Sequence, residues 1–318
     1  ARLGTLVVSV GNITVGGTGK TPVVELLART LTQRGRKVAI LTRGYKSADL
    51  DKPQEWKDKD GRQPENLPKI ASDGETRYLG PLHSGDEPFM LAKNLDGVAV
   101  LVDKNRIKSG IFAIEHLGCD TLLLDDGMQY LKLAHELDIV LVDCGAPFGT
   151  GAMLPRGTLR EPRGSLARAS YIVLTKCGGK PQDELIAAIR KYNPVADIIV
   201  SDHGPRYLEN VFTGERLPLE ALQGKWVACL SGIARPESFE DSLRSLGAHV
   251  EICRRFPDHH WFEQAELQEF YDRCADRAMD MIVTTEKDAV RLEKPEEDPE
   301  VPIYFLRIEV ELSLIHIS

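Results

Sequence analysis

Residues 8–22, VSVGNITVGGTGKTP, are the most informative part of this sequence. An apolar strand is predicted over residues 5–10. A glycine-rich loop follows it, and Gly19-Lys20-Thr21 opens directly onto an amphipathic helix pattern. Glycines allow the backbone to turn its N–H groups toward an anion, and a helix N-terminus adds positive dipole. The order strand, glycine loop, helix therefore predicts a phosphate-binding loop.

Two side chains of this loop have the chemistry of nucleotide binding. The Lys20 ammonium can reach β- and γ-phosphates, and the Thr21 hydroxyl can hold Mg²⁺. Thr14 stands where the usual pattern has glycine, six residues before the lysine. The alternative, a glycine-rich turn with Lys20 in solvent, does not explain the glycines beside Lys-Thr. The residues predicted to contact the nucleotide are Thr14, Gly16, Gly17, Thr18, Gly19, Lys20 and Thr21.

Apolar, β-branched runs alternate with helical patterns through the first two thirds of the chain. Further strands are predicted at 38–42, 98–102, 121–124, 138–143, 171–175 and 197–201, and helices at 22–34, 87–94, 104–117 and 182–191. Continuous apolar strands separated by helices are typical of a parallel sheet covered on both faces. Together with the phosphate loop, they predict a P-loop NTPase-type α/β domain over residues 1–203. Two long segments, 47–84 and 145–169, show no periodicity.

A second, smaller α/β domain is predicted over residues 225–318. Its strand patterns lie at 226–230, 249–254, 281–284 and 303–307, and its helical patterns at 236–246, 263–278 and 287–292. Residues 204–224 link the two domains, and 210–216 resembles a hairpin that turns near Thr213-Gly214.

Carboxylates follow one predicted strand and open one predicted helix. Asp125 and Asp126 end an apolar strand, and in a phosphate-loop domain such an acid usually supplies a Mg²⁺ ligand. Strand alternation points the two in different directions, so one of them is expected to face the metal. Asp86 and Glu87 begin a helix, where one could accept a proton while the other helps to hold Mg²⁺. Helix capping is the alternative for each acidic pair.

Other elements carry groups suited to proton or phosphate chemistry. His259 and His260 lie in FPDHHW at 256–261, and histidine exchanges protons near pH 7. The alternative there is a surface loop with an aromatic anchor. Arg43 ends a strand and Arg160 lies in an arginine-bearing loop, where planar guanidinium groups suit phosphate and solvated loop charge is the alternative.

The run TKCG at residues 175–178 stands where phosphate-loop GTPases read guanine. Gly178 replaces the aspartate that would accept hydrogen bonds from guanine, so selective guanine reading is not expected. Lys176 could still pack on a base.

Composition limits the classes of partner. A net charge of −8 argues against broad nucleic-acid binding, which depends on Lys and Arg neutralising phosphates, so no nucleic-acid partner is expected. The six cysteines are scattered and form no CxxC pair, which predicts reduced, structural thiols. No apolar run reaches the ~18 residues of a membrane span. The chain begins at Ala1, just before its first strand, so a missing N-terminal segment is expected.

Taken together, these motifs resemble the tetraacyldisaccharide 4′-kinase family, the lipid A 4′-kinases. The resemblance spans roughly residues 6–292 in a consistent order. Its elements are SVGN at 9–12 with 14–22, RGY at 43–45, GDEP at 85–88, DDGMQ at 125–129, LP at 154–155 with LREP at 159–162, FPDH at 256–259 and TEKDAV at 285–290. Seven such elements in one order make the resemblance specific.

The resemblance implies a reaction and a location. It implies transfer of the γ-phosphoryl group of ATP, with Mg²⁺, to the 4′-hydroxyl of a tetraacyldisaccharide 1-phosphate. It also implies two α/β domains joined by a two-stranded linker, with the active site in the cleft that the second domain completes. A lipid substrate requires membrane contact, so peripheral association with the cytoplasmic face of the bacterial inner membrane is expected. The hydrophobic N-terminal anchor usual in the family would precede Ala1.

The family roles carry over to matching positions of this sequence. Asp86 would be the base on the sugar hydroxyl, paired with His259 from the second domain. The expected catalytic residues are Asp86, His259 and Lys20, the metal-holding residues Thr21, Glu87 and Asp126, and the weaker candidates for substrate contact Arg160 and Glu161.

Two other classes of protein share parts of this pattern. One is a phosphate-loop switch or metallochaperone-type NTPase, which acts by binding a partner protein and makes no phosphorylated product. The missing aspartate that would bind guanine, and the presence of Asp86 and His259, argue against this class. The other is a kinase or ATP-dependent ligase of similar architecture that acts on a water-soluble metabolite. Activity without lipid or detergent would indicate the latter.

Overall fold

The structure is a computed structural model that describes residues 1–50, 52, 54–58, 60–258, 260–295 and 299–314. Two compact units are present: unit 1 is Ala1–His203 together with the chain from Val310 onward, and unit 2 is Gly204–Glu309. The strands β8 (Asp197–Asn210) and β13 (Ile303–Leu314) each pass from one unit into the other. The sequence-based division places the chain from residue 310 in the second domain, whereas the structure groups it with the first.

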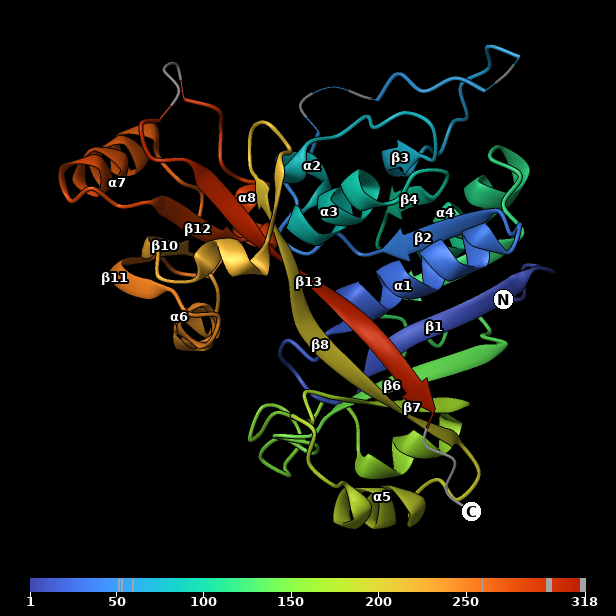
Figure 1. The fold of residues 1–318 in the computed structure, drawn as a ribbon. Helices are drawn as coiled ribbons and strands as arrows, with labels where there is room; N and C mark the ends of the chain where they lie inside the picture. Colours follow the sequence, from blue (N-terminus) through green and yellow to red (C-terminus); the bar gives the residue numbers. More distant parts are fainter. Residues whose placement is uncertain (51, 53, 59, 259, 296–298, 315–318) are drawn as a thin grey trace. The chain divides into compact units, whose positions relative to one another are not determined.

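The strands of unit 1 lie side by side in one sheet (Figure 1). Its order is β3 (Lys69–Asp73), β4 (Ala99–Val102), β2 (Val38–Thr42), β5 (Thr121–Asp125), β1 (Leu6–Asn12), β6 (Leu137–Asp143), β7 (Tyr171–Thr175) and β8. In this order, every neighbouring pair of strands from β4 to β8 is parallel, which confirms the predicted parallel sheet. Such strands are buried on both faces, which is why their sequences are apolar rather than alternating.

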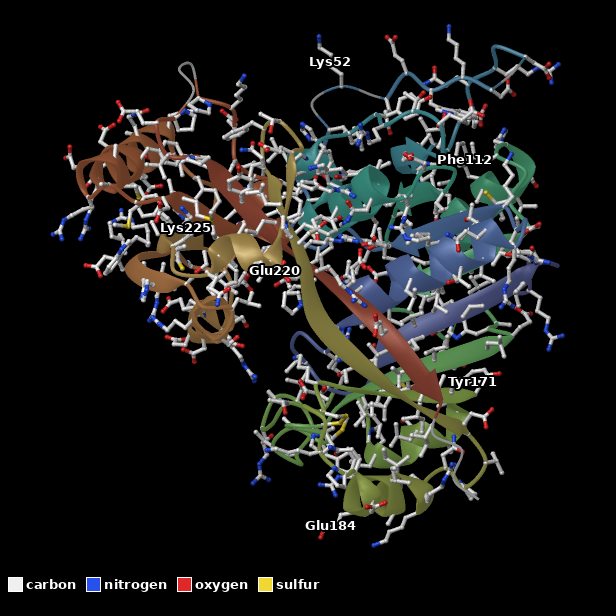
Figure 2. The ribbon with its side chains drawn as sticks, in the orientation of Figure 1. Lys52, Phe112, Tyr171, Glu184, Glu220 and Lys225 are labelled. Atoms are coloured by element: carbon white, nitrogen blue, oxygen red, sulfur yellow. A yellow bond between two sulfur atoms is a disulfide. The ribbon has the colours of Figure 1, made fainter. Side chains whose placement is uncertain are left out.

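Helices cover both faces of this sheet. Residues of α1 (Lys20–Gln33) and α3 (Asp86–Asn94) share a core with Val8, whereas the next-door Val7 packs with α4 (Arg106–Glu115) on the opposite face. Helix α5 (Asp183–Arg190) packs against β6 and β7. Figure 2 labels Phe112, the large side chain that α4 contributes to this core.

The segment 47–84 contains structure that its lack of periodicity did not predict. It forms the edge strand β3, which pairs antiparallel with β4, and the short helix α2 (Pro81–Ser84). Trp56 is buried there and meets the Phe112 ring edge-on, with centroids 4.9 Å apart. The strand was missed because only Ile70 and Ala71 in it are apolar, a run too short to carry a pattern.

Unit 2 has a four-stranded parallel arrangement of β11 (His249–Arg255), β10 (Trp226–Ser231), β12 (Met281–Thr285) and β13. Helix α7 (Gln264–Asp276) packs on one face and α6 (Pro236–Ser245) on the other, and α8 (Glu286–Ala289) follows β12. The hairpin expected near Thr213-Gly214 is formed by β8 and β9 (Arg216–Pro218). A 3-10 helix, η2 (Leu219–Leu222), follows it.

The expectation of reduced thiols is wrong for one pair, because Cys144 and Cys177 form a disulfide (Figure 2). Strands β6 and β7 are parallel neighbours with Asp143 opposite Thr175, so the residues just beyond their carboxyl ends meet. The 33-residue separation in sequence concealed this proximity. In the part of the chain that the structure describes, no helix is both long enough and apolar enough to cross a membrane.

Candidate active site

The glycine-rich loop leaves backbone donors open for an anion. Gly16 and Gly19 have φ of 108° and 85°, the left-handed region that glycine adopts without strain. A Cβ on Gly19 would lie 2.6 Å from Nε2 of His203, so this position also lacks room for a side chain. Helix α1 begins at Lys20 with no side-chain cap, and its first turn, described in full, contains no acidic residue. Its N-terminal N–H groups are therefore available to phosphate.

A second loop, residues 145–169, is bound to the glycine-rich loop through the backbone. The Val15 N–H donates to the carbonyl of Thr158 at 2.8 Å, and the Arg160 N–H donates to the carbonyl of Ile13 at 2.7 Å. The 3-10 helix η1 (Arg163–Arg168) follows in the same loop. This pairing brings Arg160 to the end of β1, although it lies 140 residues after Lys20 in the sequence.

Four side chains form a polar and charged network at the end of β1: Asn12, Lys20, Asp126 and Arg160. Arg160 donates from Nη1 to Oδ1 of Asp126 and from Nη2 to Oδ2, each at 2.7 Å. The Lys20 ammonium lies 3.6 Å from Asp126 Oδ1. The fully buried Asn12 accepts from Lys20 Nζ and from Arg160 Nη1 through its Oδ1, each at 3.3 Å. One carboxylate and one amide thereby fix the positions of two cations.

The two adjacent aspartates differ in their charge. Burial works to raise the pKa of Asp126, but the hydrogen bonds from Arg160 and the charge of Lys20 outweigh it, and the pKa lies below its usual value. Burial, with the charge of Glu87, raises the pKa of Asp125 to about 7. Thr42 Oγ1 donates to Asp125 at 3.3 Å. At neutral pH Asp126 is therefore ionised, whereas Asp125 is only partly ionised.

Thr21 and Glu87 form a hydrogen-bonded pair close to this network. Thr21 Oγ1 donates to Glu87 Oε2 at 3.0 Å, and Glu87 is exposed in the first turn of α3. The neighbouring Asp86 is buried, and Gly85 before it has φ of 95°. Among the described residues, no cluster of three or more His, Cys, Asp or Glu has the geometry of a metal site. Hydroxyl and carboxylate oxygens are nevertheless the donors that Mg²⁺ prefers.

Glu161 already has two donors within the protein. Its carboxylate accepts from Gln129 Nε2 at 2.9 Å and from Arg168 Nη2 at 2.7 Å. Gln129 Nε2 also lies 3.0 Å from the Asn12 carbonyl oxygen. These bonds join η1, the turn after β5 and the end of β1, so Glu161 stabilises the loop that carries Arg160.

In unit 2, the FPDHHW stretch is held by polar contacts to its neighbours. His260 stacks on Phe256, with ring centroids 4.7 Å apart, and its Nε2 lies 2.9 Å from Glu266 Oε2. Arg291 Nη1 donates to the His260 carbonyl at 2.6 Å, and Lys287 donates to Asp258 at 3.1 Å. His259, the expected partner of Asp86, lies outside the described residues.

The model of one protein family, LpxK, tetraacyldisaccharide-1-P 4′-kinase, matches residues 1–316. The chain belongs to this family. The tetraacyldisaccharide 4′-kinase of Anaeromyxobacter dehalogenans is 43% identical over 295 residues, 92% of this chain and 74% of that protein. The corresponding enzyme of Syntrophus aciditrophicus is 38% identical and covers 97% of this chain and 81% of its own.

A solved structure of the same family has the same fold. LpxK from Aquifex aeolicus, crystallised in complex with ATP, is 28% identical, with a TM-score of 0.72 over 98% of this chain and 86% of that one. The predicted P-loop NTPase-type α/β fold and the predicted family are thereby confirmed. The chain is a transferase of the kinase class with ATP as phosphoryl donor.

The structure of this LpxK family member shows contacts that the sequence did not predict. Asn12 lies in the SVGN motif, yet a neutral amide at a strand end has no chemical signature of its own. Thr42 contacts Asp125 from a strand more than 80 positions away. Lys176, which the sequence suggested could pack on a base, donates to the glycine-rich loop and to Asp143. Only the folded sheet edge brings these side chains to the site.

Proposed function

We propose that this kinase phosphorylates the 4′-hydroxyl of a tetraacyldisaccharide 1-phosphate at the carboxyl edge of the unit 1 sheet. The single observation that carries the proposal is the network of Lys20, Asn12, Asp126 and Arg160 beside the glycine-rich loop. It places two cations and the open N-terminus of α1 in one location, which is what a transferring phosphoryl group needs.

The glycine-rich loop and Lys20 bind the phosphates of ATP. Backbone N–H groups of the loop and the start of α1 contact phosphate oxygens, and the Lys20 ammonium neutralises charge at the β- and γ-positions. Asp126 and Asn12 hold Lys20 in place, so the ammonium is oriented before the nucleotide binds. Positioning of this kind is the main contribution of a protein to phosphoryl transfer.

Thr21, Glu87 and Asp126 are the residues that would hold Mg²⁺. Their hydroxyl and carboxylate oxygens suit a hard divalent cation, and Thr21 and Glu87 are already within hydrogen-bonding distance of each other. When bound, the ion supplies charge neutralisation on the phosphates. Asp126 also remains paired with Arg160, which keeps its carboxylate oriented.

Asp86 accepts the proton of the attacking hydroxyl in this proposal. The 4′-oxygen forms a bond to the γ-phosphorus, the bond from that phosphorus to the bridging oxygen breaks, and ADP leaves. The support for Asp86 is its buried position beside Glu87 at the start of α3, together with the GDEP motif. His259 is proposed to act with it from the FPDH motif.

The acylated substrate requires a lipid surface. We infer peripheral contact of this chain with the cytoplasmic face of the bacterial inner membrane, because acyl chains do not leave a bilayer readily. Cosedimentation with liposomes that contain the substrate tests the contact, with liposomes lacking it as the control. Recovery of the protein in the supernatant in both cases would contradict the inference.

A transfer assay with γ-labelled ATP tests the reaction and the base. Wild-type protein, Mg²⁺ and the tetraacyldisaccharide 1-phosphate in detergent micelles should give a labelled bisphosphorylated lipid. Asp86→Ala and His259→Ala should lower turnover about 10²-fold or more, the usual contribution of a general base. Asp96→Ala, an exposed aspartate just beyond α3, is the matched control. Turnover of Asp86→Ala within twofold of wild type would eliminate Asp86 as the base.

A further inference from the structure

Two consecutive carbonyls of the glycine-rich loop are bound by consecutive side chains at the end of β7. Thr175 Oγ1 donates to the Thr18 carbonyl at 3.0 Å. Lys176 Nζ donates to the Gly17 carbonyl at 2.5 Å. Thr175 and Thr18 are both buried, so this contact is shielded from water. The TKCG run thus meets the loop through its backbone.

The Lys176 side chain is itself fixed from a second strand. Its ammonium lies 2.8 Å from Asp143 Oδ2 at the end of β6, and the Asp143 side chain is only 15% exposed. The residues immediately after this ion pair, Cys144 and Cys177, are joined by the disulfide. The ends of β6 and β7 are therefore linked twice, once by charge and once covalently, next to the glycine-rich loop.

Because the peptide unit is planar, these contacts also orient the N–H groups of the loop. In a planar trans peptide the N–H points opposite to the C=O of the same unit. When Lys176 and Thr175 bind the carbonyls of residues 17 and 18, the N–H groups of Thr18 and Gly19 point away from β7. Both N–H groups belong to the stretch expected to contact phosphate. The glycines that allow this conformation would otherwise leave the loop free to sample others.

We propose that Thr175 and Lys176, with Asp143, are positioning residues that fix the orientation of the phosphate-binding N–H groups, and that they do not select the base. The inference rests on the proposed function, since it takes this loop as the nucleotide site. It assigns a role to the TKCG run, whose Gly178 carries no base-reading group. A preorganised loop binds nucleotide without losing conformational entropy at that moment.

Nucleotide affinity without lipid gives the direct test. Lys176→Met and Thr175→Val should each raise the Kd for ATP about tenfold, as expected for loss of one well-placed hydrogen bond to a loop that must then be ordered. The Kd for GTP should rise by the same factor, so the ratio of the two affinities stays constant. Thr175→Ser, which retains the hydroxyl, should bind ATP with the wild-type affinity. Lys180→Met, an exposed lysine in the same turn, is the matched control.

Four outcomes distinguish the possibilities. A Kd for ATP within twofold of wild type in both Lys176→Met and Thr175→Val overturns the proposal. A changed ratio of ATP to GTP affinity in Lys176→Met also overturns it, because that residue would then read the base. Failure of wild-type protein to bind ATP would count against this loop as the nucleotide site, and hence against both proposals. Normal ATP binding with no lipid product would count against the proposed function alone.

Discussion

Arg160 and Asp126 meet through two parallel hydrogen bonds, each 2.7 Å long. The guanidinium group also contacts Asn12, and the carboxylate also faces Lys20. A planar fork on a carboxylate fixes both partners in direction as well as in distance. The relationship joins the arginine-bearing loop to the end of β5, so it couples that loop to the proposed phosphate site.

Replacement of Arg160 by lysine should therefore lower activity even though the charge is kept. A single ammonium cannot bind both oxygens of Asp126, and the carboxylate would lose its fixed orientation. We expect kcat/KM to fall about 10- to 100-fold, measured as transfer of label to the lipid, which corresponds to about 1.4–2.7 kcal/mol. Arg156→Lys, in the same loop and exposed, should be neutral. Equal activity of Arg160→Lys and wild type would show that the fork is dispensable.

The Thr21 hydroxyl should determine the requirement for Mg²⁺. Thr21→Val removes an oxygen ligand while keeping the shape of the side chain, so half-maximal activity should need a higher Mg²⁺ concentration by about tenfold. Thr21→Ser should behave as wild type. The check is a titration of activity with Mg²⁺ after chelator treatment. Thr30→Val, later in α1, is the control, because Thr30 donates only to the Leu26 carbonyl. An unchanged Mg²⁺ midpoint in Thr21→Val would remove Thr21 from the metal site.

The pair of Glu240 and Arg255 should give unit 2 a stability that depends on acid pH. Hydrogen bonds from Arg255 Nε and Nη2, at 2.8 and 2.9 Å, hold the pKa of Glu240 below its ordinary value of 4.5. A lowered pKa in the folded state stabilises the protein above pH 4.5, and this stabilisation is lost as the pH falls through the folded value.

Denaturant unfolding of wild type and Glu240→Gln tests this dependence. The difference in the free energy of unfolding should be present at pH 6 and should shrink as the pH falls below 4.5. Glu269→Gln, an exposed glutamate on α7, should show no such trend. A difference that is constant with pH would mean that Glu240 acts through packing and not through charge.

Asp288 and Arg291 should be essential to the stability of unit 2. Both side chains are fully buried and form an ion pair, and Asp288 also accepts from the Gly232 N–H at 3.0 Å and from Thr285 Oγ1 at 2.6 Å. Asp288→Ala leaves the buried guanidinium of Arg291 without a carboxylate to balance its charge, which costs about 3–5 kcal/mol. Asp276→Ala at the end of α7 removes only an exposed carboxylate and should cost less than about 0.5 kcal/mol. Similar unfolding midpoints for the two variants would contradict the burial argument.

The disulfide predicts a thiol count. Of the six cysteines, Cys119, Cys229, Cys253 and Cys274 are free. Titration of unfolded protein should therefore find four thiols without reductant and six after reduction. Cys144→Ser should leave five both before and after reduction, because Cys177 is released. Six thiols in the untreated protein would show that the pair is reduced in solution.

Much of the fold could be read from local patterns. Strands β2 and β7 begin and end where predicted, and α1, α4 and α5 differ from prediction by one or two residues at each end. Parallel strands and amphipathic helices leave such patterns because every residue of the strand, or one face of the helix, is buried. The edge strand β3 left none, because it is short and only two of its residues are apolar.

The family followed from the sequence alone, and so did the prediction of a phosphate-binding loop and of the residue types proposed to carry the chemistry. Strand, glycine and lysine lie next to one another in the chain, so local order was enough. Tertiary structure alone decided that Arg160 binds Asp126, that Asn12 holds two cations, and that Lys176 and Thr175 bind the loop backbone. Apart from Asn12 and Lys20, which are eight positions apart, the partners are separated by 34 to 159 positions in the chain. Only the pairing of β1 with β5 and β6, and of β6 with β7, brings their carboxyl ends to one edge.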